Sequence, residues 1–182
     1  MSRDGSPHPE QEALLQRWQE ALESLAELAD RLGTPLDQGI IETVAGLNVH
    51  QIPTRQSCEG HDDHGEALPW IDIETDEPSD WQDNETAKKA WMAANREQAK
   101  KVQSLLNQWY EQRLNDGDRI DTNAMLTLRP KGIFGAVRLE PSPQSQISAL
   151  TEDQRHAASA PSRQEMQRFT EFLRQHFLGG SL

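Results

Sequence analysis

Residues 70–74 read Trp-Ile-Asp-Ile-Glu, and residues 51–58 before them read Gln-Ile-Pro-Thr-Arg-Gln-Ser-Cys. The first stretch alternates apolar and polar side chains, which is the pattern of a strand with one buried face. The second stretch is short and carries Pro53, which favours a strand at the edge of a sheet. The turn-rich residues 60–69 join the two. We therefore expect two neighbouring strands whose connecting loop lies at one end of a sheet.

Helical patterns and a second hairpin surround this pair of strands. Helices are expected over residues 12–32, ending at Gly33, over about 34–48, with Thr34 as N-cap and Pro35 as first helical residue, and over about 86–114. Residues 124–129 and 133–140 are expected to pair as strands around a turn at 130–132. The predicted order is α-α-β-β-α-β-β-α. Without regular βαβ alternation, this order indicates an α+β fold with a small, mostly antiparallel sheet of about four strands packed with helices.

Three segments, 1–11, 74–86 and 141–161, are almost free of large apolar residues, which predicts that none has a packed core of its own. Residues 1–11 are expected to be a disordered tail, and residues 141–161, rich in Pro, Ser and Gln, a linker. Between them lies an α+β domain over residues 12–140. Ser162–Glu165 has a capping-box pattern and predicts a last amphipathic helix over 162–178. We expect this helix to dock on the domain; the alternative is a partner-binding helix on a tether.

The charge of the chain argues against several classes of partner. The 182 residues contain 30 acidic and 18 basic side chains, a formal net charge of -12, with a mean hydropathy of -0.81. Nucleic-acid binders normally carry a basic face, so we expect no nucleic-acid partner, and no apolar run is long enough to span a bilayer. A single cysteine favours a cytoplasmic location. The stripe over residues 12–32 could also form a homodimeric coiled coil.

The concentrated chemistry of the chain lies in residues 57–65, Ser-Cys-Glu-Gly-His-Asp-Asp-His-Gly. Cys58, His61 and His64 have a C-x2-H-x2-H spacing, and Asp72 could return from the next strand as a fourth ligand. Zinc binds such mixed donors, and three protein ligands plus water are typical of a catalytic site. A structural zinc site usually pairs two short ligand clusters, and this sequence has one.

Three other interpretations of this stretch stay open. Cys58 could be a catalytic nucleophile whose thiolate is favoured by the imidazolium of His61 or His64, although Glu59 and two neighbouring aspartates disfavour that thiolate. Alternatively, the stretch binds a small polar ligand without a metal; Ser57, Glu59, Gly60 and His61 would then provide hydrogen bonds, Trp70 an apolar wall and Asp72 support. The last interpretation is a polar turn without chemistry, with Cys58 buried as a small hydrophobe.

Residues 36–48, 54–60 and 124–130 read Leu-Asp-Gln-Gly-Ile-Ile-Glu-Thr-Val-Ala-Gly-Leu-Asn, Thr-Arg-Gln-Ser-Cys-Glu-Gly and Ala-Met-Leu-Thr-Leu-Arg-Pro. In this order they resemble the wybutosine-synthesis methyltransferase family, which has a helix ending in Leu-Asn and then a Thr-x-Ser-Ser-Cys-x-Gly segment. The resemblance implies an α+β scaffold, a functional site near residues 57–60 and S-adenosylmethionine as ligand. The family has arginine where this chain has His61, and its substrate is tRNA. The string Ser57–His61 also resembles uncharacterised bacterial proteins.

Together these features predict a cytoplasmic protein that binds a small polar ligand or a metal ion, with zinc the first candidate, at residues 57–64. An enzyme at the same place, catalysing group transfer or hydrolysis, is the first alternative. An interaction module that works through the first or last helix is the second.

Overall fold

The computed structural model describes residues 9–28, 34–142 and 150–179 and contains four helices and a four-stranded antiparallel sheet. Along the chain the elements are α1 (Pro9–Ala26), α2 (Ile41–Val49), β1 (Thr54–Cys58), β2 (Trp70–Ile73), α3 (Glu85–Asn115), β3 (Leu126–Lys131), β4 (Ala136–Pro141) and α4 (Glu152–Phe177). The predicted α+β class and element order are confirmed. None of the described helices is both long and apolar enough to cross a bilayer.

The sheet has the strand order β1-β2-β4-β3, so β1 and β3 are its edges. Every neighbouring pair is antiparallel, with Cys58 opposite Trp70 and Ile71 opposite Leu139. β1 lies at an edge, as Pro53 just before it predicted. The edge position of β3 also explains why Pro130, which was expected to lie in a turn, is part of the strand. Proline cannot donate to a ladder, but an edge strand has one side that needs no donor.

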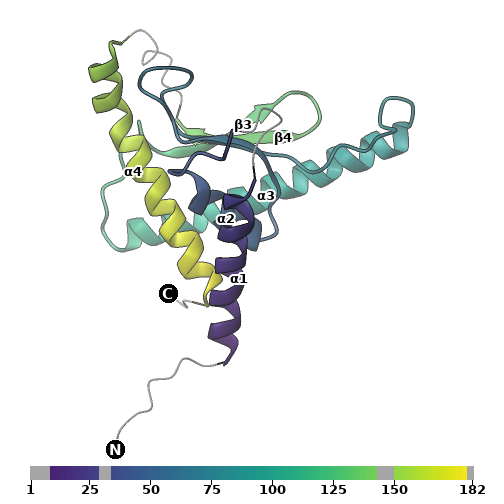
Figure 1. Ribbon diagram of the computed structural model, residues 1–182, viewed down its shortest axis with the longest axis horizontal. Helices are drawn as coiled ribbons and strands as arrows, with labels where there is room; N and C mark the ends of the chain where they lie inside the picture. Colours follow the sequence, from purple (N-terminus) through teal and green to yellow (C-terminus); the bar gives the residue numbers. More distant parts are fainter. Residues whose placement is uncertain (1–8, 29–33, 143–149, 180–182) are drawn as a thin grey trace, which may run out of the picture.

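One face of the sheet packs on the helices (Figure 1). Ile71, Ile73, Leu126 and Leu139 are almost completely buried there. α3 contacts β2, β3 and β4 and extends beyond the sheet, while α2 lies between β1 and the helices α1 and α4. Burying side chains of this size contributes about 1.5–3 kcal/mol each, so this layer is a main source of stability.

The first and last helices bury their apolar stripes within the chain. Trp18 and Leu25 of α1 are buried, and the Trp18 ring lies 6.4 Å from that of Phe177 in α4. In α4, Met166, Phe169, Phe172 and Leu173 are buried, so this helix packs its apolar face on the rest of the chain. These faces are therefore occupied by intramolecular packing; dimer formation through residues 12–32 stays a prediction. Gly33 and residues 29–32 lie outside the described residues.

The bounds of three helices differ from the sequence predictions. α1 covers Pro9–Ala26 and not 12–32, so residues 9–11 of the expected tail are helical. α2 begins at Ile41 and not near Thr34, because Asp37 and Gly39 make hydrogen bonds to Glu59 that a helix would not allow. α4 begins at Glu152, so residues 152–161 of the expected linker are helical and Pro161 lies inside the helix.

The start of α4 was predicted ten residues too late, because a stronger N-cap at Thr151 precedes the expected one. Gln154 accepts a hydrogen bond from the Thr151 N–H at 3.0 Å, the reciprocal bond of a capping box. The expected cap at residues 162–165 is instead part of the interior, since Glu165 binds Arg113 at 2.6 Å and both side chains are buried.

The face of the sheet opposite the helices contains a buried carboxylate. Asp72 has 0% exposure and accepts hydrogen bonds from Arg138 at 2.7 and 3.1 Å, while Lys131 lies 2.6 Å from it. The Arg138 guanidinium also stacks 3.6 Å from the Trp70 ring centroid. Asp72 is thus held by two cations, Arg138 on the neighbouring strand β4 and Lys131 on the edge strand β3 beyond it.

Replacing Asp72 by alanine should lower the free energy of unfolding by about 3 kcal/mol, because it leaves two cations near the sheet without their shared partner. Urea denaturation followed by circular dichroism measures this loss. Asp76→Ala, an exposed aspartate just beyond the same strand, is the matched control. Equal effects of the two substitutions would contradict a structural role for the Asp72 ion pairs.

Candidate functional site

The stretch that concentrates the chemistry leaves the sheet where β1 ends. Cys58 pairs with Trp70 in the last rung of the β1–β2 ladder, and residues 59–69 form the loop between them. Gly60 has a φ of +85°, and a Cβ there would lie 2.6 Å from the Ala67 carbonyl oxygen, so only glycine fits. The His61 N–H donates to the Glu66 carbonyl at 2.9 Å. The loop is therefore closed on itself with His61 at its beginning.

A second loop, residues 34–40 before α2, is tied to the first by two reciprocal hydrogen bonds. The Glu59 N–H donates to Oδ2 of Asp37 at 3.2 Å, and the Gly39 N–H donates to Oε2 of Glu59 at 2.6 Å. A Cβ on Gly39 would lie 2.5 Å from that same Glu59 oxygen. The close approach of the two loops thus depends on glycine at position 39, and it brings Asp37 next to Cys58.

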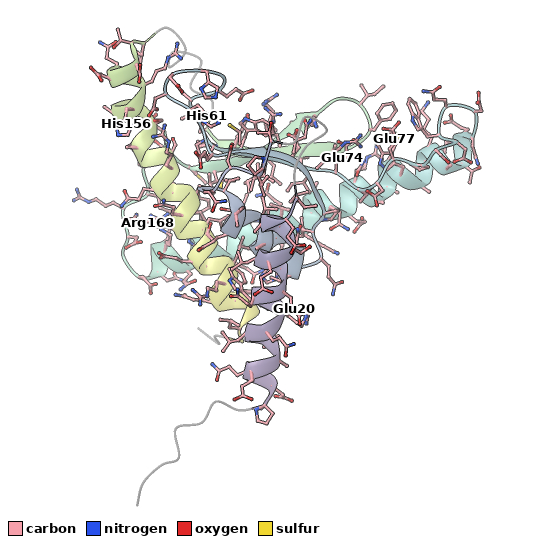
Figure 2. The ribbon with its side chains drawn as sticks, viewed as in Figure 1. Glu20, His61, Glu74, Glu77, His156 and Arg168 are labelled. Atoms are coloured by element: carbon pink, nitrogen blue, oxygen red, sulfur yellow. The ribbon has the colours of Figure 1, made fainter. Side chains whose placement is uncertain are left out.

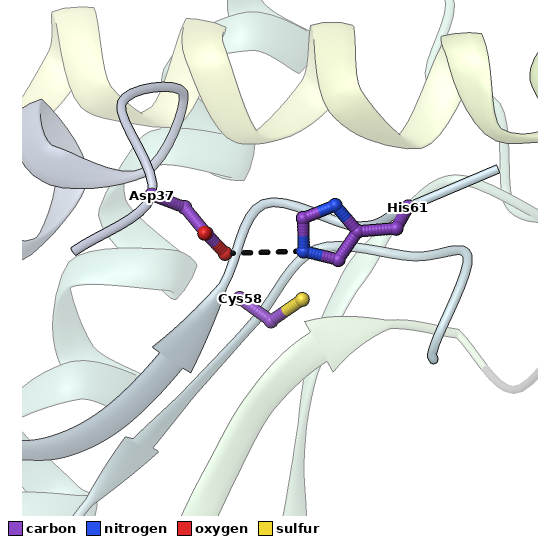
Figure 3. Close-up of side chains that lie close together, drawn as sticks. All are labelled: Asp37, Cys58 and His61. Carbon is purple, nitrogen blue, oxygen red and sulfur yellow. Dashed lines mark ion pairs between the residues drawn. The ribbon is translucent and has the colours of Figure 1, made fainter. Parts of the chain in front are cut away.

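Three potential metal ligands meet between these loops (Figure 3). One donor atom each from Asp37, Cys58 and His61 lies within 4.8 Å of the other two, and this is the one such group of three among the described residues. The His61 Nε2 lies 3.4 Å from Asp37 Oδ2, and both side chains are about one quarter exposed. The group therefore combines a carboxylate oxygen, a sulfur and an imidazole nitrogen.

The spacing of these donors is close to that of a tetrahedral metal site. Bond lengths of about 2.0 Å to nitrogen or oxygen and 2.3 Å to sulfur place zinc ligands roughly 3.3–3.8 Å apart. The group would have to contract by at most about 1.5 Å to reach this geometry. Asp37 and His61 lie on loops, so the contraction need not disturb the pairing of β1 with β2.

The protein environment keeps the Cys58 thiol protonated when no cation is bound. Burial raises the pKa of the Cys58 thiol; the hydrogen bond from the Gly60 N–H opposes this, and the charge of Asp37 raises the pKa further. A thiolate nucleophile needs a lowered pKa. The same protonation state is compatible with metal binding, because a divalent cation displaces the thiol proton.

Two of the residues predicted as metal ligands lie outside this group. His64 stacks on His61 with ring centroids 4.3 Å apart, and its Nδ1 lies 2.6 Å from Asp63 Oδ1. Asp72 does not return to the loop, because Arg138 and Lys131 hold it within the sheet. The structure thus brings together Cys58 and His61 of the predicted set and adds Asp37.

The residues predicted to bind a small ligand are divided between two cavities, each of about 470 Å³. Gly60, Glu59 and His61 line the cavity between the loop and α4. Ser57 and Trp70 line the other, together with Asp37 and other residues. Asp72 lines neither cavity. The candidate metal ligands therefore lie between two hollows, with His61 on one and Asp37 on the other.

Asp62 fastens the loop to α4. Its carboxylate accepts hydrogen bonds from Arg163 and from Ser159 at 3.3 Å, and it lies 2.7 Å from His156 Nδ1. Burial acts to raise the pKa of Asp62, but the hydrogen bonds and charges of Arg163 and His156 outweigh it and hold the pKa below its usual value. Figure 2 shows His61 and His156 at the same end of the molecule.

Asp37 is the site residue that sequence reasoning missed. The helix expected over residues 34–48 would place Asp37 in its first turn, where a carboxylate favours the positive end of the helix. The signal against that helix was Gly39, since glycine is unfavourable in a helix by about 1 kcal/mol relative to alanine. Nothing local in the sequence connects Asp37 with Cys58, because the contact is made through Glu59.

Gly39→Ala should lower the free energy of unfolding by about 1–2 kcal/mol, because the added methyl displaces the Glu59 carboxylate from the Gly39 N–H. In a Glu59→Ala background the same substitution should cost much less. Urea denaturation of the four proteins of this double-mutant cycle measures the coupling. Additive effects would mean that the methyl does not act through the Glu59 carboxylate.

Comparisons with known proteins found no relative of this chain. No family model matches the chain, and no curated protein or solved structure matches it. The resemblance of residues 54–60 to the wybutosine-synthesis methyltransferases stays a prediction from the residues themselves.

Proposed function

We propose that this protein binds one divalent transition-metal ion through Asp37, Cys58 and His61, and that zinc fits the site best. The observation that supports the proposal is the convergence of three donor atoms within 4.8 Å of one another, from the loop before α2, the end of β1 and the loop that follows β1. Zinc accepts sulfur, nitrogen and oxygen ligands together, whereas calcium and magnesium take oxygen almost exclusively.

The surroundings of the three residues support the same role. Glu59 binds both Gly39 and, through its N–H, Asp37 Oδ2, so it orients the carboxylate that would bind the metal. Such outer contacts hold metal ligands in place in known sites.

Metal binding can be tested with the full chain after removal of adventitious ions by a chelator. Calorimetric titration with Zn²⁺ should give one ion per chain. Losing an outer contact commonly costs about 10–100-fold in metal affinity, and losing a ligand costs more, so Cys58→Ser and His61→Ala should each weaken binding by at least about a hundredfold.

His64→Ala is the matched control, because His64 lies beside His61 but outside the group of three. It should leave the affinity within about threefold of the unmodified protein, given that its loss removes only a ring contact. A stoichiometry of zero, or equal losses in His61→Ala and His64→Ala, would refute this assignment of ligands.

The affinity for Zn²⁺ should rise with pH, by about tenfold per pH unit more than in Cys58→Ser. The reason is the raised pKa of the Cys58 thiol, which must lose its proton on binding the ion at any pH below that pKa. Titrations in two buffers of different ionisation enthalpy count the protons released. Identical pH slopes for the unmodified protein and Cys58→Ser would show that the thiol is not a ligand.

A further inference from the structure

The cavity between the loop and α4 borders one of the three candidate metal ligands, His61, and residues close in sequence to the other two. Its volume is about 470 Å³, within the range of roughly 300–1,000 Å³ usual for small-molecule sites. Gly39, Glu59 and His61 line one side. His61 is itself one of the ligands, Glu59 is the next residue after Cys58, and Gly39 is two residues from Asp37. A molecule in this cavity would thus lie beside the His61 imidazole that would bind the metal ion.

The wall formed by α4 combines an apolar patch with neutralised charge. Arg163 and the buried Met166 line it, and Pro69 of the loop adds apolar surface. The Arg163 guanidinium binds Asp62, which also interacts with Ser159 and His156. This cation is therefore compensated by a carboxylate and offers little attraction to an anionic ligand.

The remaining charges of the lining are negative. Besides the Asp62–Arg163 pair, the cavity is lined by the carboxylates of Glu59, Asp63 and Glu152, while His61 is the other lining residue that can carry positive charge. A hollow lined with one sign of charge concentrates ligands of the opposite sign. The lining therefore disfavours phosphates and carboxylates and favours a cationic ligand.

Three protein ligands leave one position of a tetrahedral ion for an outside donor. We infer that a small organic cation with a neutral nitrogen donor, such as an imidazole or amine, occupies this position from the cavity, with its positive end toward Glu152. This inference rests on the metal site proposed above. The nitrogen donor follows from the charges, since an anionic oxygen donor would have to enter past three carboxylates.

The test uses the full chain loaded with Co²⁺, whose visible absorption bands report changes in coordination. Two probes carry the same N-alkylated imidazole ring and opposite charges: N-(aminopropyl)imidazole is cationic, and N-(carboxyethyl)imidazole is anionic. Both should shift the Co²⁺ bands, and the cationic probe should bind at least about tenfold more tightly, because the lining charges lie within a few ångströms of it.

Three variants locate the binding in this cavity. Glu152→Gln should reduce the preference for the cationic probe several-fold while leaving Co²⁺ binding unchanged. Gln167→Trp places a large ring in the lining from an exposed position of α4 and should weaken both probes. Gln164→Trp, on the same helix but not lining the cavity, is its matched control and should bind both probes normally.

Each outcome separates the two proposals. If Co²⁺ binds with the near-ultraviolet thiolate band but neither probe shifts the spectrum, the inference is overturned and the metal site stands. Equal affinities of the two probes, or equal binding by Gln167→Trp and Gln164→Trp, also overturn it. If Co²⁺ does not bind at all, the metal site is refuted and the inference falls with it.

Discussion

Cys58 faces Trp70 in the last rung of the β1–β2 ladder, and this antiparallel pairing fixes the end of the sheet from which residues 59–69 depart. The loop is then held from two sides by carboxylates that are close neighbours in sequence. Glu59 binds the loop before α2, and Asp62 binds α4. These contacts hold the loop backbone on both sides of His61. The candidate site is thus a consequence of how one short loop is anchored.

Ion pairing decides which carboxylates of this acidic chain remain available to a cation. Asp62 lies in the loop, and Asp72 follows it in the next strand. The Asp62 carboxylate is bound by the Arg163 guanidinium on α4, and that of Asp72 by the Arg138 guanidinium in the sheet. A carboxylate whose oxygens already accept from arginine has a satisfied charge and gains less from a metal ion. Asp37 has instead the imidazole of His61 and a backbone N–H as partners. It is therefore the carboxylate best placed to serve as a ligand.

The sequence predicted the elements whose stability is local and missed the features that depend on contacts across the chain. Helix α3 and the strand at residues 70–73 follow from periodicity, and Cys58 and His61 from their spacing. Pro161 and its neighbours suggested a linker, although packing of the buried Ser159 and Ser162 holds them in a helix. The alternation of residues 70–74 correctly predicted on which face of the sheet Asp72 lies. Its partners, Arg138 and Lys131, lie on strands that are far away in the sequence. No local pattern reveals such pairings.

The placement of the three ligands also explains how an ion could bind without opposing the fold. Cys58 ends a strand and is fixed by the ladder, whereas Asp37 and His61 lie on loops that can approach it. Those loops are already joined by the hydrogen bond between Glu59 and Asp37. A closer approach of the loops would therefore break none of the backbone pairs between β1 and β2. The cost of ordering a metal site is high when its ligands must be gathered from an open chain. Here most of that ordering is supplied by the hydrogen bonds of Glu59 and Asp62, which leaves more of the binding free energy as affinity.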